Sequence, residues 1–332
     1  MAYTYTKQPK FSYSRLSAYE LCSFRYKLTY EDKHFFFSET AANMFGTLIH
    51  YIEEQIGKCL KDKLPIDYDK LKEDFYTLNI PKTSPYDSKG GVFGVNIIKQ
   101  KFPVEFARVD DNGESFVKKT ENYLKTGIYR LENYLKMNPA LSIYGTEMYF
   151  EITVKGQMIT GSLDRVYFNS TTNEFIIEDI KTKDKQFKAE ELQAPLQFVI
   201  YTKALSSMTG FPMDKISCTY DLPIVGIKQP AGSPGYVETG LKELEDIVTG
   251  ITSKNYPPKP SPLCAYCSFS ATNPHQPEAA KRLCPYYSLW TPDKKKKGVA
   301  IKYRGPEYLD EDIATIFGPS KIEGLEDFDF EF

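Results

Sequence analysis

Two aspartates and a lysine lie in a stretch of the sequence that is typical of paired strands. Asp164 belongs to the segment GSLDRVYF, and Asp179 and Lys181 belong to the segment EFIIEDIKT that follows it. Two carboxylates and an ammonium that meet at a strand end form a site for a hard divalent cation such as Mg²⁺ or Mn²⁺. The lysine would orient or deprotonate an attacking water. The alternative is an ordinary hairpin whose charges pair as a salt bridge.

The pattern of the surrounding residues predicts the elements that position these groups. Residues 158–168 and 174–180 are rich in β-branched and aromatic residues, and residues 169–173 between them have turn chemistry. We therefore expect a β-hairpin that brings Asp164 and Asp179 together. Because strand side chains alternate, the lysine two positions after Asp179 shares its face.

A helix is expected directly after this hairpin. In residues 190–207, Gln197 and Tyr201 lie four positions apart on one side of the predicted helix. With this helix after the two strands, the chain resembles the RecB nuclease-domain branch of the PD-(D/E)xK phosphodiesterase superfamily. That branch has a GxxDR strand, a DxKT strand and a QxxxY helix in this order. The residues that carry the resemblance are Gly161, Asp164, Arg165, Asp179, Lys181, Thr182, Gln197 and Tyr201.

The resemblance implies a fold, an activity and roles for individual residues. The fold would be an α/β, restriction-endonuclease-like core with a mixed central sheet flanked by helices. The activity would be hydrolysis of DNA phosphodiesters by an exonuclease that processes ends in recombination, repair or replication, on DNA with a single-stranded end. Asp164, Asp179 and the carbonyl of Ile180 would bind the metal, and Lys181 would be the catalytic lysine. The glutamine and tyrosine of the helix would contact DNA or hold the site.

His50 and Glu147 are further candidates for this site. Residues 41–60 form the clearest amphipathic helix, and His50 lies on its polar face, where it could be a solvated bystander. The resemblance instead implies a third metal ligand, because Gly46 and His50 match a GxxxH pattern. Residues 143–154 predict the first strand of the sheet. Glu147 in that strand could assist the metal or pair with a nearby lysine.

The cysteines indicate a second site. Cys264 and Cys267 form a CxxC pair and Cys284 follows, a spacing that suits Zn²⁺ or an iron–sulfur centre, either of which needs four ligands. Cys22 alone would be a small buried hydrophobe. Its SxSxLxxYxxC context, however, resembles the AddB-type and CRISPR-associated exonucleases, in which one N-terminal and three C-terminal cysteines hold a [4Fe-4S] cluster. Zinc held by the three C-terminal cysteines with either His275 or Cys22 is the alternative.

Composition limits where such a protein works. The chain has 332 residues and a formal net charge of −2, so any DNA-binding surface must be local. We expect no transmembrane segment and no signal peptide, and therefore a cytoplasmic protein of a bacterial or phage-infected cell. In that reducing compartment, six cysteines favour a metal site over a disulfide framework.

The domain organisation follows from these segments. We expect residues 1–290 to form one nuclease domain, with a helical part at 14–60, a catalytic core at 143–208 and a cysteine segment at 256–290. Residues 291–332 would be a basic linker and an acidic tail. The other predicted elements are helices at 14–30, 68–78, 114–136 and 241–252, and strands at 215–225 and 235–239.

The predicted tail ends in EGLEDFDFEF, in which phenylalanine alternates with acidic residues. A disordered solubilising tail would not need that alternation. The ending looks like the acidic tips of single-stranded-DNA-binding proteins, so we expect a replication or recombination protein to dock on it, or the tail to cover the protein's own basic groove.

The competing hypothesis is a non-catalytic DNA-binding or recombination-scaffold subunit that keeps a nuclease-like fold. Asp164, Asp179 and Lys181 are all present. An inactive relative has no evident physical need for these three residues, so the sequence favours an enzyme.

Overall fold

The computed structural model describes residues 10–34, 40–80, 91–109, 115–233, 235–259, 264, 267–269 and 283–284. The chain divides into two compact units, each built from separate segments. The central unit comprises Glu39–Thr153 and Met158–Glu243. The terminal unit comprises Met1–Ser38, Val154–Gln157 and Leu244–Phe332. The predicted acidic tail and His275 lie outside the described residues.

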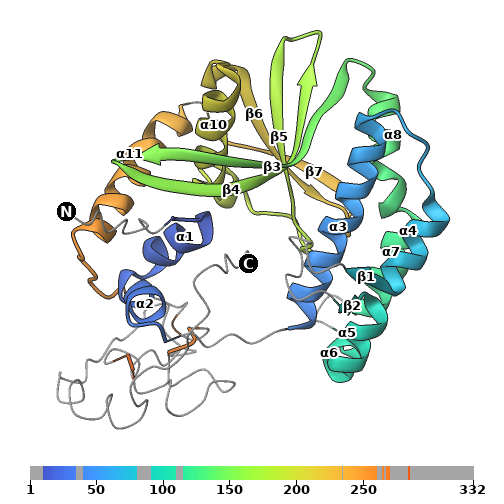
Figure 1. Ribbon diagram of the computed structural model, residues 1–332, viewed down its shortest axis with the longest axis horizontal. Helices are drawn as coiled ribbons and strands as arrows, with labels where there is room; N and C mark the ends of the chain where they lie inside the picture. Colours follow the sequence, from blue (N-terminus) through green and yellow to red (C-terminus); the bar gives the residue numbers. More distant parts are fainter. Residues whose placement is uncertain are drawn as a thin grey trace, which may run out of the picture. The chain divides into compact units, whose positions relative to one another are not determined.

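A five-stranded mixed sheet forms the centre of the fold (Figure 1). Its strands, in spatial order, are β3 (Leu141–Val154), β4 (Gln157–Asn169), β5 (Glu174–Ile180), β6 (Ile216–Leu222) and β7 (Ile227–Ala231). Strand β5 pairs antiparallel with β4 and parallel with β6, whereas β6 and β7 are antiparallel. The crossover from β5 to β6 contains α9 (Ala189–Leu192) and α10 (Leu196–Thr209). The mixed α/β architecture predicted from the sequence is confirmed.

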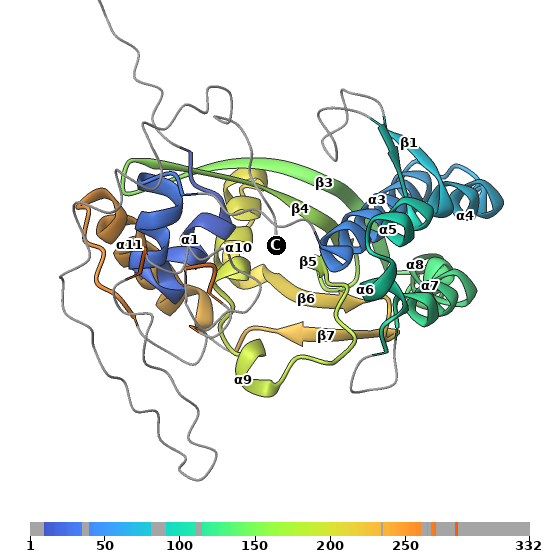
Figure 2. The ribbon, with the colours of Figure 1, turned by 90° about the horizontal axis from the view of Figure 1, so that it is seen from below.

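The long helix α3 (Ala41–Lys61) organises the helical side of the central unit. Its apolar stripe is buried, and the Thr40 side chain caps its first turn by accepting a hydrogen bond from the Asn43 amide at 3.2 Å. Figure 2 shows α3 among the other helices of this side. They are α4 (Tyr68–Tyr76), α5 (Val95–Lys101), α6 (Pro103–Ala107), α7 (Phe116–Lys125) and α8 (Arg130–Met137). Together with the short strands β1 (Leu78–Ile80) and β2 (Gly91–Phe93), they enclose an aromatic-rich core.

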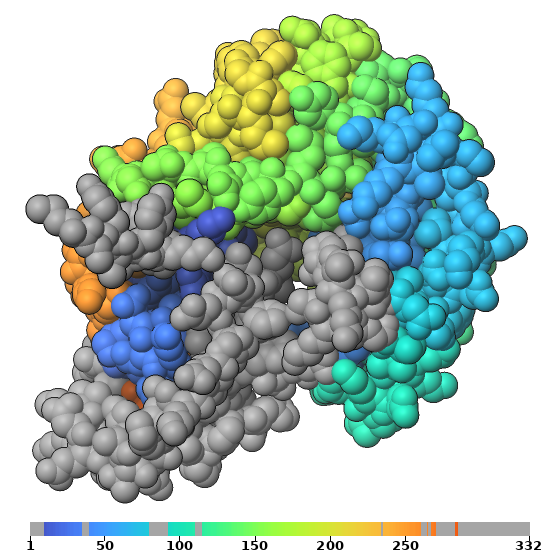
Figure 3. All heavy atoms as spheres, in the orientation of Figure 1, coloured from blue at the N-terminus to red at the C-terminus, as the bar shows by residue number. Residues whose placement is uncertain are grey.

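Apolar and polar residues alternate in the sequence of the outer strand β3 because one of its faces is buried and the other is exposed. Along most of its length buried residues such as Phe150 and Ile152 alternate with exposed ones such as Tyr149. The green atoms of β3 and β4 form part of the surface in the space-filling view (Figure 3). Strand β5, in contrast, lies between two neighbours and buries most of its residues, which explains its almost continuous apolar sequence.

The terminal unit contains α1 (Tyr13–Leu21), α2 (Ser23–Tyr26), the π-helical turn η1 (Lys27–Glu31) and the last part of α11 (Tyr236–Thr252). Hydrogen bonds join its N-terminal helices to the segment after α11, one of them from Lys259 Nζ to the Glu20 carbonyl at 2.9 Å. The Tyr19 hydroxyl donates to the Asn255 carbonyl at 2.5 Å, and the Ser23 hydroxyl donates to the Pro257 carbonyl. No helix among the described residues is long and apolar enough to cross a bilayer.

Several predicted elements differ from the structure. The helix expected at 114–136 is divided into α7, a 3₁₀ turn (Gly127–Tyr129) and α8. A Cβ at Gly127 would lie 2.5 Å from the Tyr123 ring, so the chain turns at a position that only glycine fits. The edge strand expected at 235–239 is wrong, because these residues begin α11 and the sheet ends instead with β7. Pro195 similarly separates α9 from α10 within the helix expected at 190–207.

Candidate active site

The predicted hairpin places the two aspartates opposite each other. Strands β4 and β5 pair Arg165 with Glu178 at the end of their register, and Asp164 and Asp179 are the residues next to that pair on the two strands. The amide of Ile180 donates a hydrogen bond to Asp164 Oδ2 at 2.7 Å. Both aspartate side chains are buried. The end of β5 is therefore a place where two carboxylates meet away from bulk water.

Lys181 and Gln197 flank the Asp179 carboxylate. Lys181 Nζ lies 2.9 Å from Asp179 Oδ2. Gln197 Nε2 lies 2.9 Å from Asp179 Oδ1 and 2.8 Å from the Tyr201 hydroxyl, and it donates to both. Since the Gln197 and Tyr201 side chains are buried, the pair orients the carboxylate from within α10. Contact of these two residues with DNA stays a prediction.

His50 and Glu147 join Asp164 in a group that could hold a cation. One potential ligand atom from each residue lies within 4.8 Å of the others. His50 Nδ1 is 3.6 Å from Asp164 Oδ2, and the Ser162 hydroxyl donates to Glu147 Oε2 at 2.9 Å. Asp179 lies beside this group across the hairpin.

Helix α3 approaches the end of β5 at Gly46. A Cβ at Gly46 would lie 3.4 Å from Oγ1 of Thr182, the residue after Lys181. The GxxxH and DxKT segments, far apart in the sequence, are therefore in contact. This approach explains how His50, one turn after Gly46, reaches the aspartates.

A distortion of β3 accompanies Glu147. This residue has a φ of +44°, which is unusual for a residue with a side chain and within a strand marks a local bulge. At the neighbouring Gly145, a Cβ would lie only 2.2 Å from Met148 Sδ. Such conformations carry strain and persist where the surroundings enforce them, often at functional sites. The bulge changes the direction of Glu147, so the alternation of β3 alone could not locate this side chain.

The electrostatics of the two aspartates fit a cation. Burial raises the pKa of Asp164 to about 6 although Lys181 opposes the shift, and burial raises the pKa of Asp179 to about 6 in the same way. Asp179 Oδ2 is buried, and the Lys181 ammonium at 2.9 Å is its partner. The site thus holds more carboxylate charge than its surroundings compensate. A divalent cation bound by His50, Glu147 and Asp164 would supply the missing positive charge.

These pKa shifts predict a pH-dependent response to metal. Both folded-state pKa values are raised from 3.8 to about 6, so the metal-free protein loses stability as the pH rises through this window. A cation must displace those protons below about pH 6. We expect the increase in Tm caused by Mn²⁺, measured against EDTA, to be large above pH 6 and to decline below it. The variant Asp164→Asn should lose most of the increase at every pH, whereas an increase in the native protein that stays constant from about pH 5 to about pH 8 would contradict the assignment.

Four cysteines lie in the terminal unit. Leu28, Phe269 and Leu283 form a buried cluster against which Phe24, Cys267 and Cys284 pack. Burial raises the pKa of the Cys267 thiol, and neighbouring Cys22 and Cys264 raise it further. None of the six cysteines, all of which are among the described residues, forms a disulfide. Cys22, from the start of the chain, therefore lies near cysteines from the predicted C-terminal segment.

The chain matches proteins of known structure at low sequence identity. The curated proteins contain no match. A solved structure of a presumed exonuclease from Eubacterium rectale is 11% identical, has a TM-score of 0.43, and covers 80% of this chain and 91% of its own. The solved structure of SSO0001 is 17% identical, has a TM-score of 0.28, and covers 76% of this chain and 96% of its own. The sequence model of the PD-(D/E)XK nuclease superfamily matches residues 10–272, a range that includes every residue of the candidate active site but not Cys284. The chain belongs to the PD-(D/E)XK nuclease superfamily.

Proposed function

We propose that the protein is a metal-dependent deoxyribonuclease that acts as an exonuclease on DNA ends. The observation that carries the proposal is the meeting of Asp164, Asp179 and Lys181 beside His50 and Glu147. Processing of DNA in recombination, repair or replication is the role that this activity would serve. Docking of a replication or recombination protein on the acidic tail stays a prediction.

The site residues have distinct tasks in this proposal. A cation held by His50, Asp164, Asp179 and the Ile180 carbonyl, with Glu147 beside it, would stabilise the charge that develops on the scissile phosphate. Lys181 orients the attacking water and relays its proton to solvent: the ammonium gives up one proton as it takes the proton of the water, while the new bond to phosphorus forms. The bond to the leaving oxygen breaks, and that oxygen takes up a proton.

Other residues of the site keep Lys181 in place. Its amide donates a hydrogen bond to the Asp221 carbonyl at 2.8 Å, which fixes the backbone beside β6. Asp179 holds its ammonium at 2.9 Å, and Gln197 holds Asp179. A lysine restrained at both ends is positioned for its task before substrate arrives.

The donor set favours Mn²⁺ over Mg²⁺. Mg²⁺ prefers oxygen ligands and strict octahedral geometry, whereas imidazole nitrogen is a ligand of first-row transition metals. Because His50 contributes nitrogen, we expect both metals to support activity, with tighter binding of Mn²⁺.

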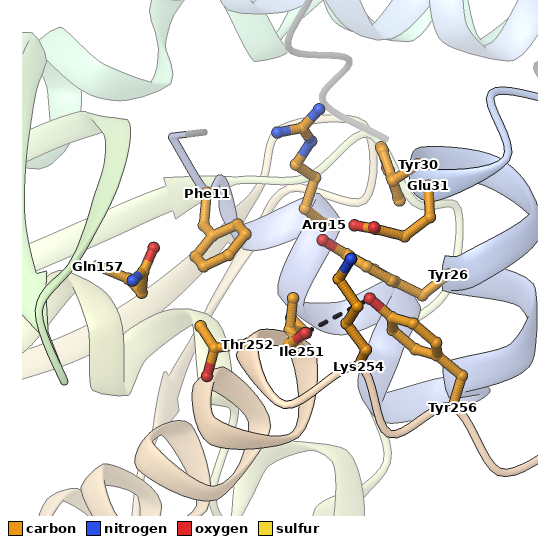
Figure 4. A pocket seen from close by; sticks show the side chains of 10 residues that line it. All are labelled: Phe11, Arg15, Tyr26, Tyr30, Glu31, Gln157, Ile251, Thr252, Lys254 and Tyr256. Carbon is orange, nitrogen blue, oxygen red and sulfur yellow. Dashed lines mark hydrogen bonds between the residues drawn. The ribbon is translucent and has the colours of Figure 1, made fainter. Parts of the chain in front are cut away.

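A pocket in the terminal unit supports DNA with a single-stranded end as the substrate. Its volume is about 230 Å³. Figure 4 shows the side chains that line it. Four are aromatic, namely Phe11, Tyr26, Tyr30 and Tyr256, and two are cationic, namely Arg15 and Lys254. Arg15 lies over the Tyr30 ring at 4.9 Å from its centroid. Phe11 and Tyr26 are buried, and Glu31 also lines the pocket. Tyr30 and Tyr256 beside the two cations are the rings that suit an unpaired base and its phosphate, because every base can stack on a ring.

Removing the charges of this pocket should weaken the binding of single strands. For Arg15→Gln and Lys254→Gln, we expect a higher Kd for single-stranded oligonucleotides and a salt slope reduced by about 0.7 for each lost phosphate contact. Fluorescence anisotropy in EDTA measures binding without cleavage. The matched control is Lys155→Gln, which removes an exposed lysine of the same unit that pairs with Glu245. Equal affinities for all three variants and the native protein would remove the pocket from the proposal.

We further propose that Cys22, Cys264, Cys267 and Cys284 hold a [4Fe-4S] cluster, with Zn²⁺ as the alternative. Cys22 and Cys264 are close enough to Cys267 to affect its pKa, and Cys284 packs with Cys267 against one apolar cluster. A set of four thiolates suits an iron–sulfur centre. Such a cluster would connect the start of the chain to its cysteine segment.

A nuclease assay with end-labelled DNA tests the proposed function. We expect single-stranded or single-strand-tailed linear DNA to be shortened from an end in Mn²⁺ or Mg²⁺, closed circles to persist, and EDTA to stop the reaction. Binding of DNA without any product in either metal would instead support the non-catalytic scaffold subunit. Cleavage of closed circles would keep the nuclease and exclude a requirement for ends.

A further inference from the structure

A network of buried charges lies next to the candidate active site, within the central unit. Its centre is Arg165, whose Nη2 is 2.9 Å from Glu53 Oε2 and whose Nη1 is 2.5 Å from Glu178 Oε1. Lys228 pairs with Glu178 and lies 3.1 Å from Asp221 Oδ2. On the other side of Asp221, Oδ1 lies 3.0 Å from a guanidinium nitrogen of Arg130. The acids and bases alternate, so each charge has a partner of opposite sign.

Tyrosines complete the network, and a glycine gives it room. The Tyr123 hydroxyl donates to Glu53 Oε1 at 2.8 Å, and the Tyr167 hydroxyl donates to Glu178 Oε1 at 2.8 Å. A Cβ at Gly57 would lie 2.6 Å from the Thr146 side chain and 3.7 Å from Arg165 Nε. The helix α3 therefore comes close to the strands at the point where Arg165 crosses to it.

Members of the network are neighbours of residues of the active site. Arg165 follows Asp164 on β4, and Glu178 precedes Asp179 on β5. Glu53 lies three residues after His50, on the same side of α3. Asp221 of β6, another member of the network, pairs with Ile180, and its carbonyl accepts the amide hydrogen of Lys181. A shift of one charge pair would thus move a residue that holds the cation or the lysine.

Burying so many charges is a poor way to gain stability, because the loss of hydration offsets most of the attraction. What a guanidinium provides instead is direction, since its planar fork fixes two partners at once. The two partners of Arg165 come from α3 and β5, while Arg165 itself belongs to β4. These are the elements that carry His50, Asp179 and Asp164.

We propose that Arg165, Glu53 and Glu178 are positioning residues that set the separation of His50, Asp164 and Asp179 for cation binding. The inference rests on the proposed function, since it assumes that these three residues serve a bound metal. It adds that the geometry of the metal site depends on charges that touch neither metal nor DNA.

Mn²⁺ binding by the full-length protein tests this inference. The variants are Arg165→Lys, Glu178→Gln and Glu53→Gln, and the control is Phe175→Leu, which disturbs the buried far end of the same hairpin. Electron paramagnetic resonance of unbound Mn²⁺ gives the Kd, and thermal melting gives the stability of each variant. We expect Kd to rise about 10- to 100-fold in the network variants and less than about twofold in a control of equal or lower Tm. In DNA hydrolysis, kcat should fall while KM changes little.

The outcomes separate this inference from the proposed function. If the native protein binds no Mn²⁺, the proposed function fails. If it binds Mn²⁺ and the network variants bind equally well, the positioning role fails while the nuclease stands. If Phe175→Leu weakens binding as much as they do, the effect is one of general stability and the positioning role is again overturned. Should Arg165→Lys not fold, Glu53→Gln decides, because glutamine keeps the shape of the side chain and one of the two acceptor oxygens that Arg165 and Tyr123 use.

Discussion

Replacing Lys181 with methionine should lower kcat for DNA hydrolysis about 100- to 10,000-fold, the contribution typical of positioned acid–base groups. Methionine keeps the length of the side chain but removes the ammonium that lies 2.9 Å from Asp179 Oδ2. Binding of DNA should persist, because the substitution removes only one of the positive charges that would contact DNA phosphates. The measurement is single-turnover cleavage of an end-labelled single strand in Mn²⁺, with binding measured separately in EDTA.

Lys183→Met is the matched control for this substitution. Lys183 stands two residues further along, has a side chain that is 39% exposed, and pairs with Glu191 at 3.5 Å. We expect cleavage by this variant to remain within about threefold of the native rate, as for surface changes away from a site. If Lys181→Met and Lys183→Met cleave equally well, Lys181 has no catalytic role.

Replacing one of the four cysteines of the terminal unit should abolish the proposed iron–sulfur cluster. The native protein, purified without oxygen, should be brown and absorb broadly near about 400 nm because of charge transfer from thiolate to iron. Cys267→Ser should lose this absorbance, since serine is a poor ligand for the cluster. Its terminal unit should also become easily cleaved by protease, because a connection between separate segments of the chain is lost.

Cys59→Ser provides the control for the cysteine experiment. Cys59 belongs to α3 in the central unit, so its replacement should leave colour and metal content unchanged. Metal analysis completes the test. A colourless anaerobic preparation with stoichiometric zinc would overturn the iron–sulfur cluster in favour of zinc.

The hairpin at the centre of the site could be predicted from the sequence for a physical reason. Strand-forming residues and turn-forming residues do not overlap in this part of the sequence. The ends of β4 and β5 in the structure therefore lie within about one residue of the predicted ends. Once the hairpin forms, its register alone makes Asp164 and Asp179 opposite neighbours. Helix α3 was equally predictable, because its apolar stripe is continuous over more than five turns.

Other features depend on contacts that no local pattern records. The direction of Glu147 depends on a bulge in β3, and the break between α7 and α8 depends on the packing of Gly127 against Tyr123. Strand β7 contains Pro230, which reads as a strand breaker yet is tolerated in this edge strand. Glu53, one of the partners of Arg165, lies far from it in the sequence. The charge network therefore becomes visible only in three dimensions.

The most direct test of the account is a crystal structure of the protein grown with Mn²⁺, with the ion located by its anomalous scattering. We predict a peak bound by His50 and Asp164, within reach of Glu147 and beside Asp179 and Lys181. A structure in which the ion binds elsewhere, or in which the side chains of Asp164, Asp179 and Lys181 lie on different surfaces, would contradict the assignment of this site.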